Sequence, residues 1–327
     1  MEFHKIEGGG YRVGIPVPFP MKYVYCYLFP KEDHYILIDA GFNYPKARDT
    51  WEEVFQYLSI DPKLIQEIYI THFHPDHSGL AGWMQEKTGA RVYMHDLDCQ
   101  MFQRVWGKGS QQAISVQSMI ESHGVPLMLS KEIEEHMEKM KTNVLPLPEI
   151  EPLPQNPYFA GREWDIIHTP GHSDGLVCFY DSVEEILLSS DFILDPITPN
   201  ISVWPGARQH PLHDYIASLK KIMEVPVKVA YTAHGEVLYH VKERAEALIY
   251  HHEKRLEKIK ELAANKTAYE IASDLFQHRE LNPHQWRFAM AETIAHLNHL
   301  EKERKLEKHN IGKLIFYNQI QPSSSMI

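Results

Sequence analysis

Apolar residues in the first hundred positions gather in short runs rich in β-branched and aromatic side chains, separated by Gly, Pro and charged turns. Runs of this kind predict strands. They cover residues 11–15, 24–29, 35–38 and 91–94. Between them the sequence predicts helices at about 45–58 and 78–88. Strands that alternate with helices are typical of a layered α/β protein.

A long stretch from about Leu97 to Lys141 interrupts this alternation and is predicted to be helical. The proline-rich segment 145–154 that follows it favours an extended connector. We expect the insertion to cover the functional cleft and to shape the substrate pocket, and a purely structural helical pair is the alternative.

Strands resume after the connector and again end in turns. They are predicted at 164–168, 176–180 and 186–188, and a further apolar run covers 229–233. A loop at 195–213 precedes a predicted helix at 214–224.

The last part of the chain is predicted to be mainly helical. Residues 243–263 form one helix, and helix starts are indicated at Thr267 by a capping-box pattern and at Asn282 by the proline that follows it. A long helix to about His309 is expected to lead into a small β-wing at 310–317. We therefore divide the chain into residues 1–240, with the helical insertion at about 97–141, and a C-terminal helical domain, 241–327.

Length and composition fit a globular protein that needs no covalent cross-links. The chain has 327 residues, of which 43% are hydrophobic, and its three cysteines imply no disulfide framework. No apolar stretch approaches the roughly 18 residues of a membrane span, and the N-terminus lacks a secretory pattern. We therefore expect a cytoplasmic protein without a membrane partner.

Charge is divided unevenly between the two parts. The first 240 residues carry 19 Lys and Arg against 32 Asp and Glu, whereas the C-terminal part carries 14 against 12. An acidic first domain repels a phosphate backbone, and the basic cluster near 302–308 is interleaved with glutamates as on a solvated helix face. We read the C-terminal part as a packing or homodimerisation module that also walls the cleft, with nucleic acid the less favoured partner.

The segment Thr71–Gly79 concentrates metal-binding chemistry. His72, His74, Asp76 and His77 place three imidazoles and a carboxylate within six residues, directly after an apolar run. Imidazole and carboxylate are the ligands that zinc and similar divalent ions prefer. A solvated, histidine-rich turn is the alternative reading of this segment taken by itself.

Three more candidate ligands follow, and each lies where an apolar strand ends in a turn. They are His172, Asp191 and His234. Sheets flanked by helices collect their chemistry in the loops beyond the strand ends. Taken with the first cluster, these residues indicate one shared metal site.

The order of these motifs resembles that of the metallo-β-lactamase-fold hydrolases, starting with Asp39 in Leu-Ile-Asp-Ala-Gly. The turn Thr169–Ser173 and the C-terminal part resemble the branch that contains glyoxalase II-like and β-lactamase-like 2 proteins. The resemblance implies an α/β fold, the αββα sandwich, followed by a helical, winged-helix-like domain.

The resemblance also implies the ligand sets. One metal would be held by His72, His74 and His172, and a second by Asp76, His77 and His234. Asp191 would bridge the two ions. Asp39 would support a ligand without being one, and Asp76 would also orient the nucleophile, so both are expected to act in catalysis.

Two divalent ions about 3.5–4 Å apart share a bridging water and lower its pKa to around neutrality, which supplies a bridging hydroxide. No Ser or Cys nucleophile is then required, and the chain has no Gly-x-Ser-x-Gly motif. Zinc is the expected ion, and manganese or iron would fit the same donors.

The expected function is hydrolysis of a small thioester, lactone or related acyl compound. A metal-dependent ribonuclease or phosphodiesterase is the alternative, because of the winged tail. A mononuclear iron sulfur dioxygenase and a non-catalytic binding protein are less favoured. Oxygen-reducing di-iron members carry Glu where this chain has His74, which argues against that redox role.

Candidate substrate-binding residues lie in two places. Arg208 is the preferred one in the loop after Asp191, because guanidinium matches carboxylate and phosphate groups in a bidentate manner. The same loop also holds Asn200, Trp204, His210 and His213. The second place is the start of the C-terminal part, where His252 and Arg255 are candidates.

Overall fold

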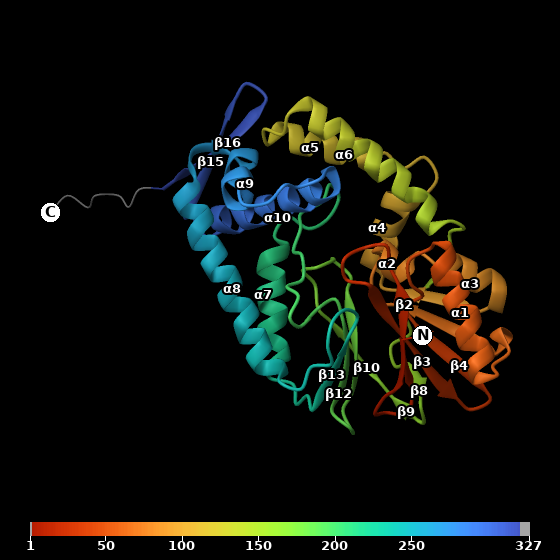
Figure 1. The fold of residues 1–327 in the computed structure, drawn as a ribbon. Helices are drawn as coiled ribbons and strands as arrows, with labels where there is room; N and C mark the ends of the chain where they lie inside the picture. The colour runs from red at the N-terminus through yellow and green to blue at the C-terminus, as the bar shows by residue number, and fades with distance from the viewer. Residues whose placement is uncertain (1, 321–327) are drawn as a thin grey trace.

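The computed structural model describes residues 2–320 and contains two β-sheets packed face to face, with helices on both outer faces (Figure 1). The first sheet has seven strands in the order β1 to β7. Their bounds are β1 Glu2–Lys5, β2 Tyr11–Pro16, β3 Tyr23–Lys31, β4 His34–Ile38, β5 Ile65–Ile70, β6 Arg91–Met94 and β7 Ile150–Pro152. The first three pairings are antiparallel and the last three are parallel.

The second sheet has four strands in the order β10 to β13. They are β10 Asp165–His168, β11 Val177–Asp181, β12 Ile186–Ser190 and β13 Val229–Thr232. A short hairpin, β8 Tyr158–Phe159 with β9 Arg162–Glu163, precedes it. Most residues of these strands are buried, which explains why they appear in the sequence as continuous apolar runs.

The two faces of each strand enter different cores. In β4, Ile36 and Ile38 pack between the sheets with Phe179 and Leu188 of the second sheet. Leu37 points the opposite way and joins a core with Trp51. Trp51 belongs to α1 (Pro45–Leu58), which covers the first sheet together with α3 (Ala81–Thr88).

The outer face of the second sheet is covered by α7 (Pro211–Ile222) and α8 (Val241–Leu262). The layers therefore follow the order helix, sheet, sheet, helix, and the predicted αββα sandwich is confirmed. The predicted insertion is also helical. It consists of α4 Asp96–Trp106, α5 Gln112–Ser122, α6 Leu127–Met140 and the 3-10 turn Lys141–Val144.

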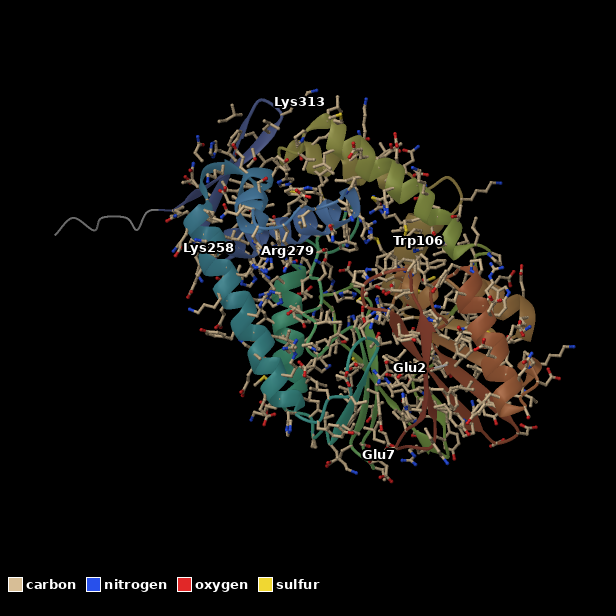
Figure 2. The ribbon with its side chains drawn as sticks, viewed as in Figure 1. Glu2, Glu7, Trp106, Lys258, Arg279 and Lys313 are labelled. Carbon is tan, nitrogen blue, oxygen red and sulfur yellow. The ribbon has the colours of Figure 1, made fainter. Side chains whose placement is uncertain are left out.

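The C-terminal region continues the core of the second sheet. After α8 it contains β14 Ala264–Thr267, α9 Ala268–Phe276, α10 Pro283–Lys302, β15 Leu306–Ile311 and β16 Leu314–Gln319. The helix α10 packs against α6, α7, α8 and α9, and both predicted helix starts are present as capping boxes. Lys313 marks the tip of the β15–β16 hairpin (Figure 2).

The predicted long helix to about His309 is wrong, because α10 ends at Lys302. The amide of Lys305 donates to the carbonyl of Leu300, Arg304 has a left-handed φ of 56°, and the chain then enters β15. The basic cluster is therefore not a helix face. Lys308 lies on the hairpin and its ammonium contacts Glu301 at 2.8 Å.

Within the described residues, no helix combines the length and the apolar character that a membrane crossing requires.

Candidate metal centre

The candidate ligands lie at strand ends that meet at one edge of the sandwich. His72 and His74 follow β5 directly, and the short helix α2 (Pro75–Ser78) carries Asp76 and His77. His172 lies in the loop after β10, while Asp191 and His234 follow β12 and β13. Four separate strand ends thus converge, as the sequence pattern predicts.

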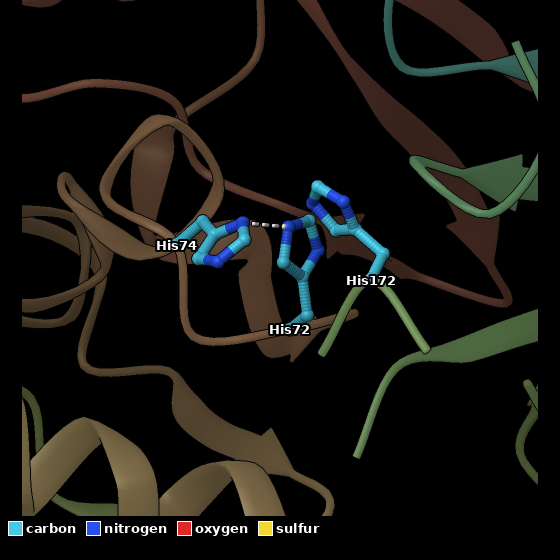
Figure 3. A group of neighbouring side chains, drawn as sticks. All are labelled: His72, His74 and His172. Atoms are coloured by element: carbon cyan, nitrogen blue, oxygen red, sulfur yellow. Dashed lines mark hydrogen bonds between the residues drawn. The ribbon is translucent and has the colours of Figure 1, made fainter. Parts of the chain in front are cut away.

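Three of the imidazoles form a first group. His72, His74 and His172 point toward one another (Figure 3), and each offers a nitrogen within 4.8 Å of the other two. The closest pair is Nε2 of His72 and Nδ1 of His74, 3.0 Å apart.

The remaining four residues form a second group under the same distance limit, and they are Asp76, His77, Asp191 and His234. Asp191 lies between the groups, because its Oδ2 is 3.4 Å from Nε2 of His172 and 3.5 Å from Nε2 of His77. Donor atoms about 2.1 Å from one ion in tetrahedral geometry lie roughly 3.4 Å apart. The spacing therefore fits two ions that share Asp191.

The hydrogen bonds of His172 and His234 use Nδ1 and leave Nε2 free to bind a metal. Nδ1 of His172 donates to the carbonyl of Asn200 at 2.8 Å, and Nδ1 of His234 donates to the carbonyl of Tyr23 at 2.8 Å. Because a carbonyl only accepts, Nδ1 carries a proton in each ring, and in the neutral ring Nε2 has the lone pair that a metal can bind. Nε2 of His77, His172 and His234 has no hydrogen-bond partner among the described residues. Buried, unpaired lone pairs of this kind fit a metal.

Burial and neighbouring charge set the protonation of the first group. Burial, together with the other imidazoles, holds the pKa of His72 well below its usual range. Burial and the adjacent His172 lower the pKa of His74 to about 3. Both imidazoles are thus neutral at physiological pH, which is the form that binds a metal.

The second group has the opposite electrostatics. Burial raises the pKa of the Asp76 carboxyl, but the imidazoles of His77 and His234 outweigh burial and lower it to about 2. Asp191 shifts in the same direction for the same reason. The carboxylates are therefore ionised at neutral pH and available as ligands.

Asp39 holds His77 from behind. Its Oδ2 accepts from Nδ1 of His77 at 2.7 Å, and its Oδ1 accepts the backbone amide of Thr71 at 2.8 Å. Asp39 follows β4 and has a left-handed φ of 60°. Asp39 therefore lies next to the candidate ligand His77, as expected for a residue that supports a ligand.

Asp98 is a structural support that sequence reasoning missed. This buried carboxylate of α4 accepts from the amide of Phe73 at 2.9 Å, the amide of Gly175 at 2.6 Å and the hydroxyl of Ser173 at 2.7 Å. It thereby ties the loop of His72 to the loop of His172. An aspartate in the first turn of a helix gives no such signal, since it usually caps or faces solvent.

A cavity of about 560 Å³ opens onto the candidate metal ligands. His74, Asp76, His172, Asp191 and His234 all line it. The rest of its wall comes mainly from the loop 18–21, the helices α4, α5 and α6 of the insertion, the loop 194–204 and the start of α10. The insertion thus lines the cavity beside the candidate ligands, and its role in shaping a substrate pocket stays a prediction.

None of the three predicted substrate-binding residues lines this cavity. Arg208 is 51% exposed and its guanidinium pairs with Asp214 at 3.2 Å. His252 is buried, with its Nδ1 3.1 Å from Nε2 of His296. Nearness in sequence to Asp191, or to a helix start, did not translate into nearness to the cavity.

Arg255 contacts Glu292 rather than the cavity. Its guanidinium lies 3.6 Å from Oε1 of Glu292, and Oε2 of Glu292 accepts from the side-chain amide of Asn200 at 3.0 Å. The carbonyl of Asn200 in turn holds His172. Arg255 is therefore linked to a candidate ligand through two intermediates, while Asn200 and Trp204 of the predicted loop do line the cavity.

Two family profiles match the chain: the metallo-beta-lactamase superfamily over residues 20–234, and the metallo-beta-lactamase-like C-terminal domain over residues 256–317. The chain belongs to the metallo-beta-lactamase superfamily. A metallo-beta-lactamase family protein of Thermus thermophilus is 32% identical, with a TM-score of 0.85 over 95% of this chain and 99% of that one. The family-level resemblance and the fold class predicted from the sequence are confirmed.

Curated relatives of this metallo-beta-lactamase superfamily chain extend over almost its whole length. A probable metallo-hydrolase of Bacillus subtilis is 23% identical over 94% of this chain and 97% of its own length. A beta-lactamase-like protein 2 homolog of Drosophila melanogaster is 25% identical over 92% of this chain and 89% of its own length.

Proposed function

We propose that this chain is a metal-dependent hydrolase of a small acyl substrate: a thioester, a lactone or a related ester. One observation carries the proposal. Two ligand groups meet with Asp191 between them, at the edge of a half-open cavity with largely apolar walls. A cavity of this size suits a small organic molecule.

The names of the relatives support this proposal. The relative from Bacillus subtilis is described as a probable metallo-hydrolase. An atrochrysone carboxyl ACP thioesterase of Aspergillus fumigatus is 23% identical over 67% of this chain and 53% of its own length. The thioester is therefore our preferred substrate class.

Two divalent ions held here would lower the pKa of a water between them and polarise the carbonyl oxygen of the substrate. Asp76 is ionised at neutral pH, so its carboxylate would accept a hydrogen bond from a water molecule there and orient it. Asp39 fixes the His77 ring, and the largely apolar walls of the cavity suit an apolar acyl chain. We propose zinc as the ion, because five of the seven candidate ligands are imidazoles, a donor that zinc prefers.

The experiment is metal analysis of the purified chain, followed by a panel of acyl thioesters, lactones and phosphodiesters. Asp191→Ala should lower the metal content and reduce kcat/KM by more than about 100-fold, because both groups lose a shared ligand. Asp49→Ala, an exposed aspartate of α1, is the control and should change neither.

Full activity of Asp191→Ala would refute the two-metal proposal. Turnover of phosphodiesters without turnover of any acyl compound would favour the nuclease alternative.

A further inference from the structure

Three polar side chains that no ligand group uses meet on the cavity wall. His136 comes from α6, whereas His284 and Arg287 come from α10, and all three line the cavity. The rings of His136 and His284 are 4.9 Å apart, and the charge of Arg287 acts on both. The two helices pack against each other, so the cluster joins the insertion to the C-terminal region.

The cluster lacks hydrogen-bond partners. Nδ1 of His136, Nδ1 of His284 and Nε of Arg287 are buried, and each is unpaired among the described residues. Buried polar atoms are normally satisfied, because an unpaired one is costly. Three such atoms in one cavity wall indicate a partner that enters from the cavity.

Arg287 differs from the other buried or half-buried arginines of the described chain, which have a polar partner. The buried Arg12 has no carboxylate partner, but its guanidinium donates to the carbonyl of Gly235 at 2.8 Å. Arg162 contacts Asp181 at 2.6 Å, Arg255 contacts Glu292 at 3.6 Å, and Arg244 contacts Asp195 at 3.5 Å. Arg287 has no carboxylate within ion-pair distance among residues 2–320. A purely structural arginine at this depth would be expected to have either a carboxylate or a carbonyl acceptor, as Arg12 does.

Aromatic rings hold the cluster in place. The guanidinium of Arg287 lies 4.5 Å from the ring centre of Phe288 and 5.6 Å from that of Trp204. The His284 ring is parallel to that of Phe19 within 4°, at 5.8 Å. Burial lowers the pKa of Arg287 to about 10, so it remains charged at neutral pH. The result is a fixed, poorly solvated cation that faces the cavity.

We propose that Arg287, His136 and His284 form a subsite for an anionic oxygen group, a carboxylate or a phosphate, carried by the substrate. The substrate then has an acyl bond at the candidate metal centre, an apolar middle that contacts the cavity wall, and an anionic end at Arg287. Guanidinium binds either group through two parallel hydrogen bonds, and the imidazoles add donors. This inference rests on the proposed function for the position of the reacting bond, but anion binding itself does not depend on it.

The kinetic test compares two thioesters of N-acetylcysteamine, succinyl and butyryl, which differ in a terminal carboxylate. The wild-type chain should show a KM for the succinyl thioester lower by on the order of 10- to 100-fold, the range of one charged hydrogen-bonded contact. Arg287→Gln should abolish that difference, and an unchanged circular dichroism spectrum and zinc content would show that the variant is folded. Arg287→Lys should retain part of the difference in KM between the two thioesters.

The matched control is Arg279→Gln, an exposed arginine between α9 and α10 (Figure 2), which should behave as wild type. Equal KM values for both thioesters in the wild type, or a preference that survives in Arg287→Gln, would overturn the proposal.

A binding test separates this inference from the proposed function. Inorganic phosphate or acetate is added to the metal-loaded full-length chain while the imidazole NMR signals of His136 and His284 are followed. Shifts in the wild type that are absent from Arg287→Gln support the subsite even if no thioester is hydrolysed, and the stronger of the two anions identifies the group. No shift, or the same shift in Arg287→Gln, contradicts it.

Discussion

Gly171 gives the sharpest test of how the fold positions a candidate metal ligand. It directly precedes His172 and has a φ of 142°. A methyl group added at this position would lie 2.6 Å from Cα and 2.8 Å from N of Tyr215. Tyr215 is fully buried in α7, and its hydroxyl donates to the carbonyl of Phe192 at 3.0 Å. The helix backbone therefore cannot move aside, and the turn that carries His172 must move instead.

The size of this movement follows from the contact distances. Ordinary contact begins at 3.4 Å, so Gly171→Ala should displace the turn by about 0.8 Å. Metal–ligand distances tolerate only about 0.2 Å. His172 should then leave the first ligand group, and kcat/KM should fall on the order of 100-fold, as for other displacements near 1 Å.

The assay is zinc content per chain after dialysis, together with turnover of the best thioester. Gly171→Ala should lose about one zinc equivalent, and the remaining ion should be held by the second group. Gly89→Ala is the control, because Gly89 also has a positive φ, 78°, but a methyl group there meets nothing within 4 Å. If Gly171→Ala kept full zinc content and activity, the turn would not be held against α7 as described.

Three further changes test the surroundings of the site. Asp39→Ala removes the acceptor that fixes His77 and should weaken zinc binding by about 10- to 100-fold in a chelator competition. An unchanged zinc affinity would argue against a supporting role of Asp39. Burial lowers the pKa of His77 and of His234, but nearby carboxylates outweigh burial and raise both pKa values above the usual one. The two protonated imidazoles therefore stabilise the metal-free fold fully below about pH 6.5, and this stabilisation is lost as the pH rises through their raised pKa values. Zinc must displace these protons, so its affinity should rise with pH, and a flat profile from pH 6 to 8 would contradict this. Lys305→Glu with Lys308→Glu, on the exposed hairpin side, should leave acyl turnover unchanged, whereas a large loss on RNA would favour the nuclease alternative.

The candidate ligands were predictable because each one follows an apolar strand. An apolar run that ends in His or Asp is visible in the sequence, and the ends of neighbouring strands meet in space. The helix starts at Thr267 and Asn282 were predictable for a similar reason, since a capping box is a local hydrogen-bond pattern.

The cavity wall was not predictable in this way. It is assembled from segments more than a hundred residues apart, such as Phe19, His136 and Arg287, and no local pattern marks them as neighbours. Arg208 was chosen because it is near Asp191 in sequence, but it pairs with Asp214 at the surface. The end of α10 was missed because the charged stretch after Lys302 suits a solvated helix as well as a hairpin.

The most direct measurement is the anomalous scattering of crystals of the full-length chain grown with zinc. Two peaks about 3.5–4 Å apart are expected, on either side of the Asp191 carboxylate. One peak should be surrounded by His72, His74 and His172, and the other by Asp76, His77 and His234. Zinc bound elsewhere, or no zinc between these side chains, would contradict the two-metal centre.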